Sequence, residues 1–78
     1  MRQKTNRLVI AFYTTHDAMA FEDACLKSGA AGRLIPLPKE ISAGCGLAWS
    51  APPGEEAGLR GVLEEAGIEP QVMKVCFI

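Results

Sequence analysis

The sequence predicts an α+β domain whose elements follow in the order βαββαβ. Four short segments rich in β-branched and aromatic residues have the pattern of strands. Two segments with apolar residues at helical spacing lie between the first and second strands and between the third and fourth. This order is typical of the ferredoxin-like sandwich, in which two helices cover one face of a four-stranded antiparallel sheet. The strands then lie in the order four, one, three, two.

The first strand and the first helix occupy the beginning of the chain. Residues 7–13 are apolar on both faces of the predicted strand, which favours a central position in the sheet. Thr14, followed three residues later by Asp17, forms a variant of the capping box and predicts a helix start. Gly29 predicts its end. The inner stripe of this helix carries one charged residue, Glu22, which must be paired or hydrogen-bonded if it faces the interior.

The second half repeats the strand and helix pattern. Residues 33–37 predict the second strand, at an edge of the sheet, because Pro36 has no N–H for a neighbouring strand. The third strand is predicted over residues 45–50 and the second helix over residues 55–66, which begins with acidic residues suited to a helix N-terminus. In residues 71–78 successive side chains alternate between two faces, which predicts the last strand.

Composition indicates one folded domain. The chain has 78 residues, of which 49% are hydrophobic and 22% charged, unlike a disordered segment. We expect a flexible tail at residues 1–6 and a single domain over residues 7–78.

The charge and hydropathy of the chain bear on its partners and location. A net charge of −1 does not indicate a basic surface of the kind that binds nucleic acid or an anionic membrane. No apolar run approaches the roughly 20 residues of a membrane span, and the N-terminus lacks a signal-peptide pattern. We therefore expect a cytoplasmic protein.

The loop at residues 36–46 is the candidate site. It is long for so small a domain, and long ordered loops are often functional. It presents one cysteine, Cys45, between Gly44 and Gly46. Flanking glycines allow unusual backbone conformations and the close approach of a partner. Because the first two strands run in the same direction, the start of the first helix, with His16, should lie near this cysteine.

Several neighbours can favour the thiolate form of Cys45. A helix N-terminus or a nearby cation does so, and His16 and Lys39 are the candidate cations. Backbone amides of the loop can also gather around the sulfur and favour its thiolate form. We expect Glu22 to support the loop by accepting hydrogen bonds from it, for example from Ser42. The candidate catalytic residue is thus Cys45, and the supporting residues are Gly44, Gly46, Ser42, His16, Glu22 and Lys39.

The other two cysteines, Cys25 and Cys76, are expected to be buried small apolar residues. Three cysteines without a C-x-x-C pair suit neither a disulfide framework nor a zinc site. We therefore expect reduced thiols, no metal and no cofactor.

Two stretches carry a resemblance to a known family. Residues 35–46 read Ile-Pro-Leu-Pro-Lys-Glu-Ile-Ser-Ala-Gly-Cys-Gly, and residues 14–22 read Thr-Thr-His-Asp-Ala-x-x-x-Glu. Over residues 8–77 the chain resembles the small domain family called putative selenium/sulfur carrier protein-like.

The resemblance implies a chemistry for the cysteine. Cys45 would be the carrier residue, holding sulfur or selenium as a persulfide or perselenide. Ala18 and Glu22 would belong to the family pattern on the first helix. The family usually shows arginine where Lys39 stands, and lysine does not offer the two parallel hydrogen bonds that arginine offers to an anion.

We therefore predict a sulfur or selenium carrier. Cys45 would take the terminal chalcogen from a donor's persulfide and pass it to an acceptor protein, which makes the chain a transfer protein more than an enzyme with its own turnover. The expected partners are a persulfide or selenide donor, such as a cysteine desulfurase, and an acceptor protein, with no nucleic acid and no membrane. The alternative is a non-catalytic protein-interaction module that uses residues 36–46, with Cys45 incidental or redox-sensing.

The strands also predict a homodimer. Two helices can cover only one face of the sheet, and the other face would expose an apolar patch that soluble monomers seldom tolerate. Twofold pairing of such faces is the commonest solution. The alternative is a monomer in which Tyr13, Lys74 and the N-terminal tail shield the patch. The apolar residues assigned to the uncovered face are Val9, Ala11, Val72 and Ile78.

Overall fold

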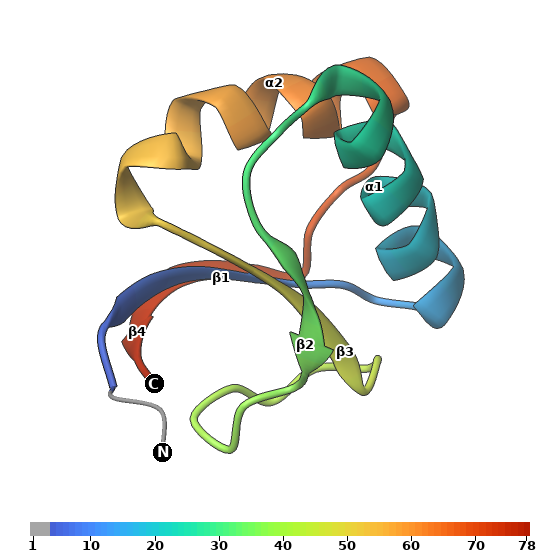
Figure 1. Cartoon of the computed structure of the whole chain (residues 1–78). Coiled ribbons are helices and arrows are strands. Elements are labelled where there is room, and N and C mark those ends of the chain that lie inside the picture. The colour runs from blue at the N-terminus through green and yellow to red at the C-terminus, as the bar shows by residue number, and fades with distance from the viewer. Residues whose placement is uncertain (1–3) are drawn as a thin grey trace.

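The computed structural model describes residues 4–78 of the chain. Its elements confirm the predicted order (Figure 1). They are β1 (Asn6–Ala11), α1 (Thr15–Ser28), β2 (Arg33–Pro36), β3 (Leu47–Ala51), a short 3₁₀ turn (Pro53–Glu55), α2 (Glu56–Ala66) and β4 (Val72–Phe77).

The four strands form one antiparallel sheet in the order β2-β3-β1-β4, as the ferredoxin-like prediction requires. Both helices lie on one face of this sheet, and the long loop between β2 and β3 lies on the other (Figure 1). Because β1 and β2 run in the same direction, the β2–β3 loop and the start of α1 meet at one end of the sheet.

Helix α1 begins and ends where the sequence predicts. The side-chain oxygen of Thr14 accepts a hydrogen bond from the backbone N–H of Asp17 at 3.1 Å. This bond satisfies one of the N–H groups that a helix start leaves unpaired. Gly29 closes the helix with a left-handed φ of 74°, a conformation that glycine adopts without steric cost. The two caps therefore define the residues at which α1 begins and ends.

Strand boundaries differ from the prediction by one or two residues, and one of these differences concerns the site. β1 ends at Ala11 instead of residue 13, because the chain there turns toward α1. β3 begins at Leu47 and not at Cys45. The bond from the Leu37 N–H to the Gly46 carbonyl, at 2.9 Å, lies just outside the strand pairs. Cys45 therefore belongs to the loop and not to a strand.

The main core lies between the sheet and the helices. Phe21 of α1 is fully buried, with ring centroids 5.4 Å from those of both Phe12 and Trp49, and it meets the Trp49 ring edge-on at 88°. The Trp49 indole N–H donates to the carbonyl of Ala31 at 3.1 Å, so its polar atom is satisfied. This aromatic cluster fixes α1 against β3, the strand that follows Cys45.

A second, smaller core lies on the sheet face that the helices do not cover. Ile41 of the loop packs over this face and is buried there. Leu37 and Ala43, from the same loop, are partly buried against it. The loop thus covers much of the second sheet face (Figure 1). The buried sheet residues beneath it are Val9, Ala11, Ala48 and Cys76.

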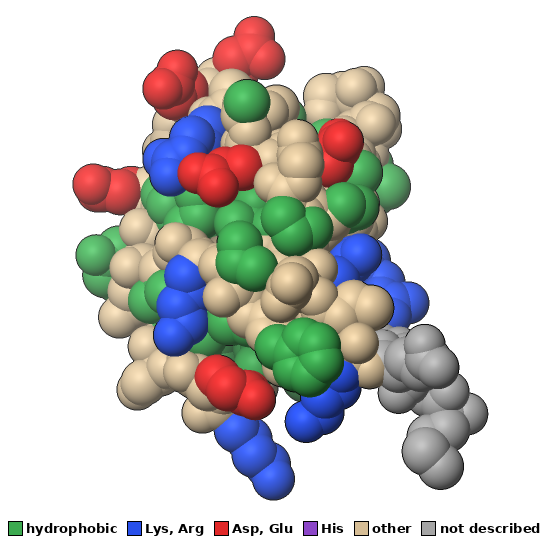
Figure 2. All heavy atoms as spheres, turned by 90° about the vertical axis from the view of Figure 1, so that its left-hand side faces the viewer, with side chains coloured by type: hydrophobic (Ala, Val, Ile, Leu, Met, Phe, Trp, Pro, Cys, Tyr) green, Lys and Arg blue, Asp and Glu red, His purple; other side chains and the backbone are tan. Residues whose placement is uncertain are grey.

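This covering corrects the premise from which the homodimer was predicted. Val9 and Ala11 are fully buried within the single chain, so they leave no apolar patch to be paired. Two of the large apolar side chains that are exposed lie on β4, where Val75 is 49% and Phe77 61% exposed. Figure 2 shows hydrophobic side chains across the middle of one face of the molecule, with acidic side chains mostly above them. The homodimer itself stays a prediction, which sedimentation equilibrium at micromolar concentration decides.

The described end of the N-terminal segment is paired with the end of the chain. Thr5 exchanges two backbone hydrogen bonds with Ile78, at 2.9 and 3.0 Å. Of the tail predicted at residues 1–6, residues 1–3 lie outside the described residues. Within residues 4–78, no helix is long and apolar enough to cross a membrane.

Candidate functional site around Cys45

Cys45 lies at the junction of the β2–β3 loop and the helix-side core. Its side chain belongs to the main core cluster and is only 3% exposed. The backbone N–H of Leu47 donates a hydrogen bond to the Cys45 sulfur at 3.3 Å. The hydroxyl oxygen of Thr15 lies 3.6 Å from the same sulfur. Two hydrogen-bonding groups therefore meet at one buried sulfur atom.

The start of α1 is beside Cys45, as the topology predicts, but a different residue makes the contact. Thr15 is the first residue of α1, so the sulfur lies at the positive end of the helix dipole. His16, the residue expected at this place, has an exposed side chain. Thr15 was missed because a helix start points its first side chains in different directions, and the capping pattern alone does not say which one turns to the loop.

The two glycines beside Cys45 differ in what they do. Neither has a positive φ, so the expected special backbone conformation is wrong for both. Gly44 passes close to the chain after β1: a Cβ added to it would lie 2.8 Å from the carbonyl oxygen of Tyr13. A Cβ on Gly46 would meet nothing within 4 Å. Gly44 is therefore required for close packing, whereas Gly46 is not.

A glutamine that the sequence reasoning did not single out holds the loop. The side-chain oxygen of Gln71, the residue before β4, accepts a hydrogen bond from the Gly44 N–H at 2.9 Å. Its own backbone N–H donates to the carbonyl of Ala11 at 2.9 Å. Gln71 thus ties the cysteine-bearing loop to the end of β1. No local pattern marks this residue, because the contact joins positions 27 apart in the sequence.

The remaining predicted supports are not brought to the sulfur by hydrogen bonds. Ser42 and Lys39 are exposed on the loop. Glu22 is half-buried on α1, and no hydrogen bond or ion pair among residues 4–78 involves its side chain. The expected bracing of the loop by Glu22 is therefore not formed here. Glu22 lies on α1, which covers one face of the sheet, whereas Ser42 belongs to the β2–β3 loop, which lies on the other face (Figure 1).

The other cysteines lie in different surroundings. Cys25 is buried in the main core, and burial raises the pKa of its thiol to about 11, so it stays protonated at neutral pH. Cys76 is buried in the second core, under the loop. All three thiols are free. No group of three or more histidine, cysteine, aspartate or glutamate side chains in the described part of the chain could hold a metal ion.

The fit of Gly44 predicts a difference between two glycine variants. Gly44→Ala places a methyl group against the Tyr13 carbonyl oxygen and should lower the free energy of unfolding by about 1–3 kcal/mol. Gly46→Ala is the matched control and should change it by less than about 0.5 kcal/mol. Urea denaturation of both variants measures the difference. Equal stabilities would contradict the close approach at Gly44.

Comparison with known proteins identifies the family. The family model described as Putative Se/S carrier protein-like matches residues 7–73, which is most of the chain and includes the loop with Cys45. No curated protein and no solved structure matches. The match therefore includes the β2–β3 loop with Cys45 and ends within β4. The chain belongs to the putative Se/S carrier protein-like family.

Proposed function

We propose that this protein carries a sulfur or selenium atom on Cys45. In the loading step the Cys45 thiolate attacks the terminal sulfur of a donor persulfide. The sulfur–sulfur bond of the donor breaks, a new bond forms to the Cys45 sulfur, and the donor leaves as a thiolate. The proton of the donor persulfide stays with the transferred sulfur or passes to water. The terminal sulfur keeps its oxidation state, so no external oxidant or reductant is needed.

The surroundings of the sulfur support this proposal. The Leu47 N–H donates to the Cys45 sulfur, and the Thr15 hydroxyl is placed to do the same. Together with the N-terminus of α1, these groups bring hydrogen-bond donors and the positive end of a helix dipole to the sulfur that would carry the chalcogen.

Loading requires the loop to move, because Cys45 is almost fully covered. Besides the contacts of Thr15 and Leu47 with the Cys45 sulfur, few polar bonds among the described residues restrain the loop beside the cysteine: the Gly44 N–H to the Gln71 side chain, and the Leu37 N–H to the Gly46 carbonyl. The Gln71 bond is exposed to solvent, which makes it the weaker restraint. We infer that a donor reaches the sulfur when residues 43–46 lift away from the end of β1.

This opening predicts the effect of removing the Gln71 side chain. Gln71→Ala should raise the rate at which iodoacetamide labels Cys45 by about three- to tenfold, since one neutral hydrogen bond of about 1 kcal/mol no longer opposes opening. Glu69→Ala, at an exposed position nearby, is the control and should leave the rate unchanged. Peptide mass spectrometry reports the labelling of each cysteine. An unchanged rate in Gln71→Ala would rule out this bond as the restraint.

Loading itself is tested by incubating the protein with a cysteine desulfurase and cysteine. Proteolysis and mass spectrometry then locate any added sulfur. The peptide that contains Cys45 should gain one sulfur atom, and the peptides with Cys25 and Cys76 should gain none. Addition to Cys25 or Cys76 alone, or to no peptide, would contradict the proposal.

One observation favours the alternative of an interaction module. The Cys45 side chain packs in the main core like an ordinary apolar residue, and the loop presents Pro38, Lys39 and Glu40 at its outer side. In that case the loop is a docking surface and the thiol is incidental. The loading experiment separates the two functions, because a module would not take up sulfur.

The carrier function implies partners of defined chemistry. A persulfide or selenide donor such as a cysteine desulfurase would supply the chalcogen, and an acceptor protein would remove it. A free thiol with this role belongs in a reducing compartment, so we propose a cytoplasmic location.

A further inference from the structure

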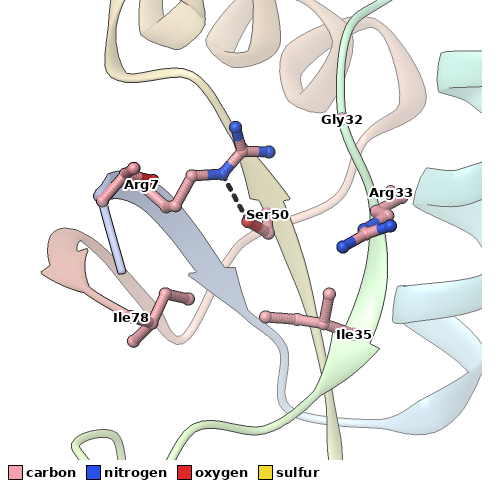
Figure 3. A pocket seen from close by; sticks show the side chains of 7 residues that line it. Arg7, Gly32, Arg33, Ile35, Ser50 and Ile78 are labelled. Atoms are coloured by element: carbon pink, nitrogen blue, oxygen red, sulfur yellow. Dashed lines mark hydrogen bonds between the residues drawn. The ribbon is translucent and has the colours of Figure 1, made fainter. Parts of the chain in front are cut away.

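A second site candidate lies on the helix-free face of the sheet, at the end away from Cys45. A hollow of about 410 Å³ opens there beside the start of β1, the start of β2 and the end of β3 (Figure 3). Cys45 precedes the first residue of β3, whereas Ser50 in this hollow lies near its last residue. The residues lining it are Thr5, Arg7, Gly32, Arg33, Ile35, Ser50 and Ile78.

Two guanidinium groups border the hollow on either side of Ser50. Figure 3 shows Arg7 on one side of this serine and Arg33 on the other. Strand register explains the placement: Arg33 pairs with Ser50 across β2 and β3, while Arg7 lies diagonally across β1. The two ion pairs within residues 4–78 join other residues, so neither arginine has a carboxylate partner there.

Ser50 is a buried polar residue with hydrogen-bonding capacity to spare. It is 5% exposed, and its hydroxyl oxygen accepts a hydrogen bond from the Nε of Arg7 at 3.0 Å. A hydroxyl can both accept and donate, and the Ser50 hydroxyl donates no hydrogen bond to another of the described residues. The Arg7 bond uses only the Nε donor, which leaves its terminal N–H groups for another partner.

The local backbone is built to hold Arg33 beside Ser50. Gly32 has a φ of 115°, and a Cβ there would overlap the Trp49 indole nitrogen and lie 2.6 Å from the Ser50 carbonyl oxygen. Glycine at this position lets β2 begin directly against β3. The arginine that follows is thereby set at the hollow.

The chemistry of these groups defines a ligand. Two arginines with unpaired positive charge suit a dianion better than a monoanion, and guanidinium groups bind phosphate oxygens through paired hydrogen bonds. The Ser50 hydroxyl adds one neutral donor. Ile35 and Ile78 supply an apolar part of the wall, which suits an organic substituent. Lys74, which faces the same side of the sheet on β4, adds to the positive field.

We propose that this hollow binds the phosphate group of a small organic phosphomonoester. The site goes beyond the carrier function and does not depend on it. Arg7 and Arg33 hold the phosphate oxygens from two sides, and Ser50 donates its hydroxyl hydrogen between them. The apolar wall contacts the organic part of the molecule.

The test is a titration followed by amide NMR shifts at constant ionic strength and at about pH 8, where a phosphomonoester is a dianion. The probes are phenyl phosphate, inorganic phosphate and benzoate, which carries the same ring and one negative charge. Phenyl phosphate should give saturable shifts at Gly32, Arg33 and Ser50. Inorganic phosphate should bind more weakly at the same amides, and benzoate at least about tenfold more weakly than phenyl phosphate.

Variants decide whether the arginines are responsible. Arg33→Gln, at an exposed position, should weaken phenyl phosphate binding by about tenfold or more. Ser50→Ala should weaken it by a smaller factor. Arg60→Gln is the matched control, since Arg60 lies on α2 in an exposed ion pair with Glu56.

Several results would overturn the proposal. Shifts that never saturate, shifts that sodium chloride reproduces, or equal weakening by Arg33→Gln and Arg60→Gln would show only general attraction of anions. Binding of benzoate as tight as that of phenyl phosphate would show that the hollow does not select a dianion. If Ser50→Ala fails to fold, the Arg33→Gln result alone decides the outcome.

Discussion

Cys45→Ser is expected to abolish sulfur loading completely. Serine has nearly the same shape as cysteine, and its hydroxyl can still accept the Leu47 N–H, so the loop should keep its conformation. The hydroxyl, however, is a far weaker nucleophile toward a persulfide sulfur than a thiolate is. Incubation with a cysteine desulfurase and cysteine should therefore leave the intact mass of this variant unchanged.

The control for this variant is Cys76→Ser. Cys76 is also a buried free thiol near the loop, but it lies in the second core and not at the start of α1. Cys76→Ser should load to the wild-type extent. Loading retained in Cys45→Ser and lost in Cys76→Ser would assign the wrong cysteine to the site.

Phe21→Ala should have the largest effect on stability, lowering the free energy of unfolding by about 3–5 kcal/mol. Phe21 is fully buried and contacts both Phe12 and Trp49, so its removal opens a cavity at the centre of the main core. For a small domain this is a large part of the total stability. Chemical denaturation measures it.

An exposed residue on the same helix gives the matched control. Met19 is 58% exposed on α1, and Met19→Ala should change the free energy of unfolding by less than about 0.5 kcal/mol. A small effect of Phe21→Ala, comparable with that of Met19→Ala, would contradict the assignment of the aromatic cluster as the main core.

The fold could be predicted because its signals are local. Thr14 and Gly29 mark the ends of α1 through capping chemistry that involves only nearby residues. The βαββαβ order of the elements predicted the strand order of a ferredoxin-like sheet, and Pro36 indicated that the second strand lies at an edge. The βαββαβ order then placed the start of α1 and the β2–β3 loop at one end, and the contact between Thr15 and Cys45 confirms that placement.

The covering of the second sheet face could not be predicted in the same way. Ile41 and Leu37 are apolar residues in a loop with no periodicity, so no pattern indicates which surface they bury. The prediction of an uncovered sheet face, from which the homodimer was argued, rested on the assumption that only the helices cover the sheet. The apolar residues inside the loop were the one available signal that it folds back.

The details of the site also depend on contacts between distant positions. Gln71 holds Gly44 across 27 positions, and a local pattern does not reveal such a pair. Glu22 was assigned to the loop because its helix stripe faces inward, but the inward face of α1 meets the sheet and the loop lies on the far side. The long loop and the flanking glycines singled out Cys45 as the candidate residue, whereas the groups that contact its sulfur became apparent only in the tertiary structure.

The carrier function is tested most directly in the variant Cys25→Ser/Cys76→Ser, in which Cys45 is the single cysteine. After loading by a cysteine desulfurase and removal of the donor, cyanide takes up the terminal sulfur of a persulfide as thiocyanate and leaves the thiolate. We expect release of about one thiocyanate per chain, and none from protein that was not loaded. Absence of thiocyanate from a folded, donor-treated sample would contradict the carrier function of Cys45.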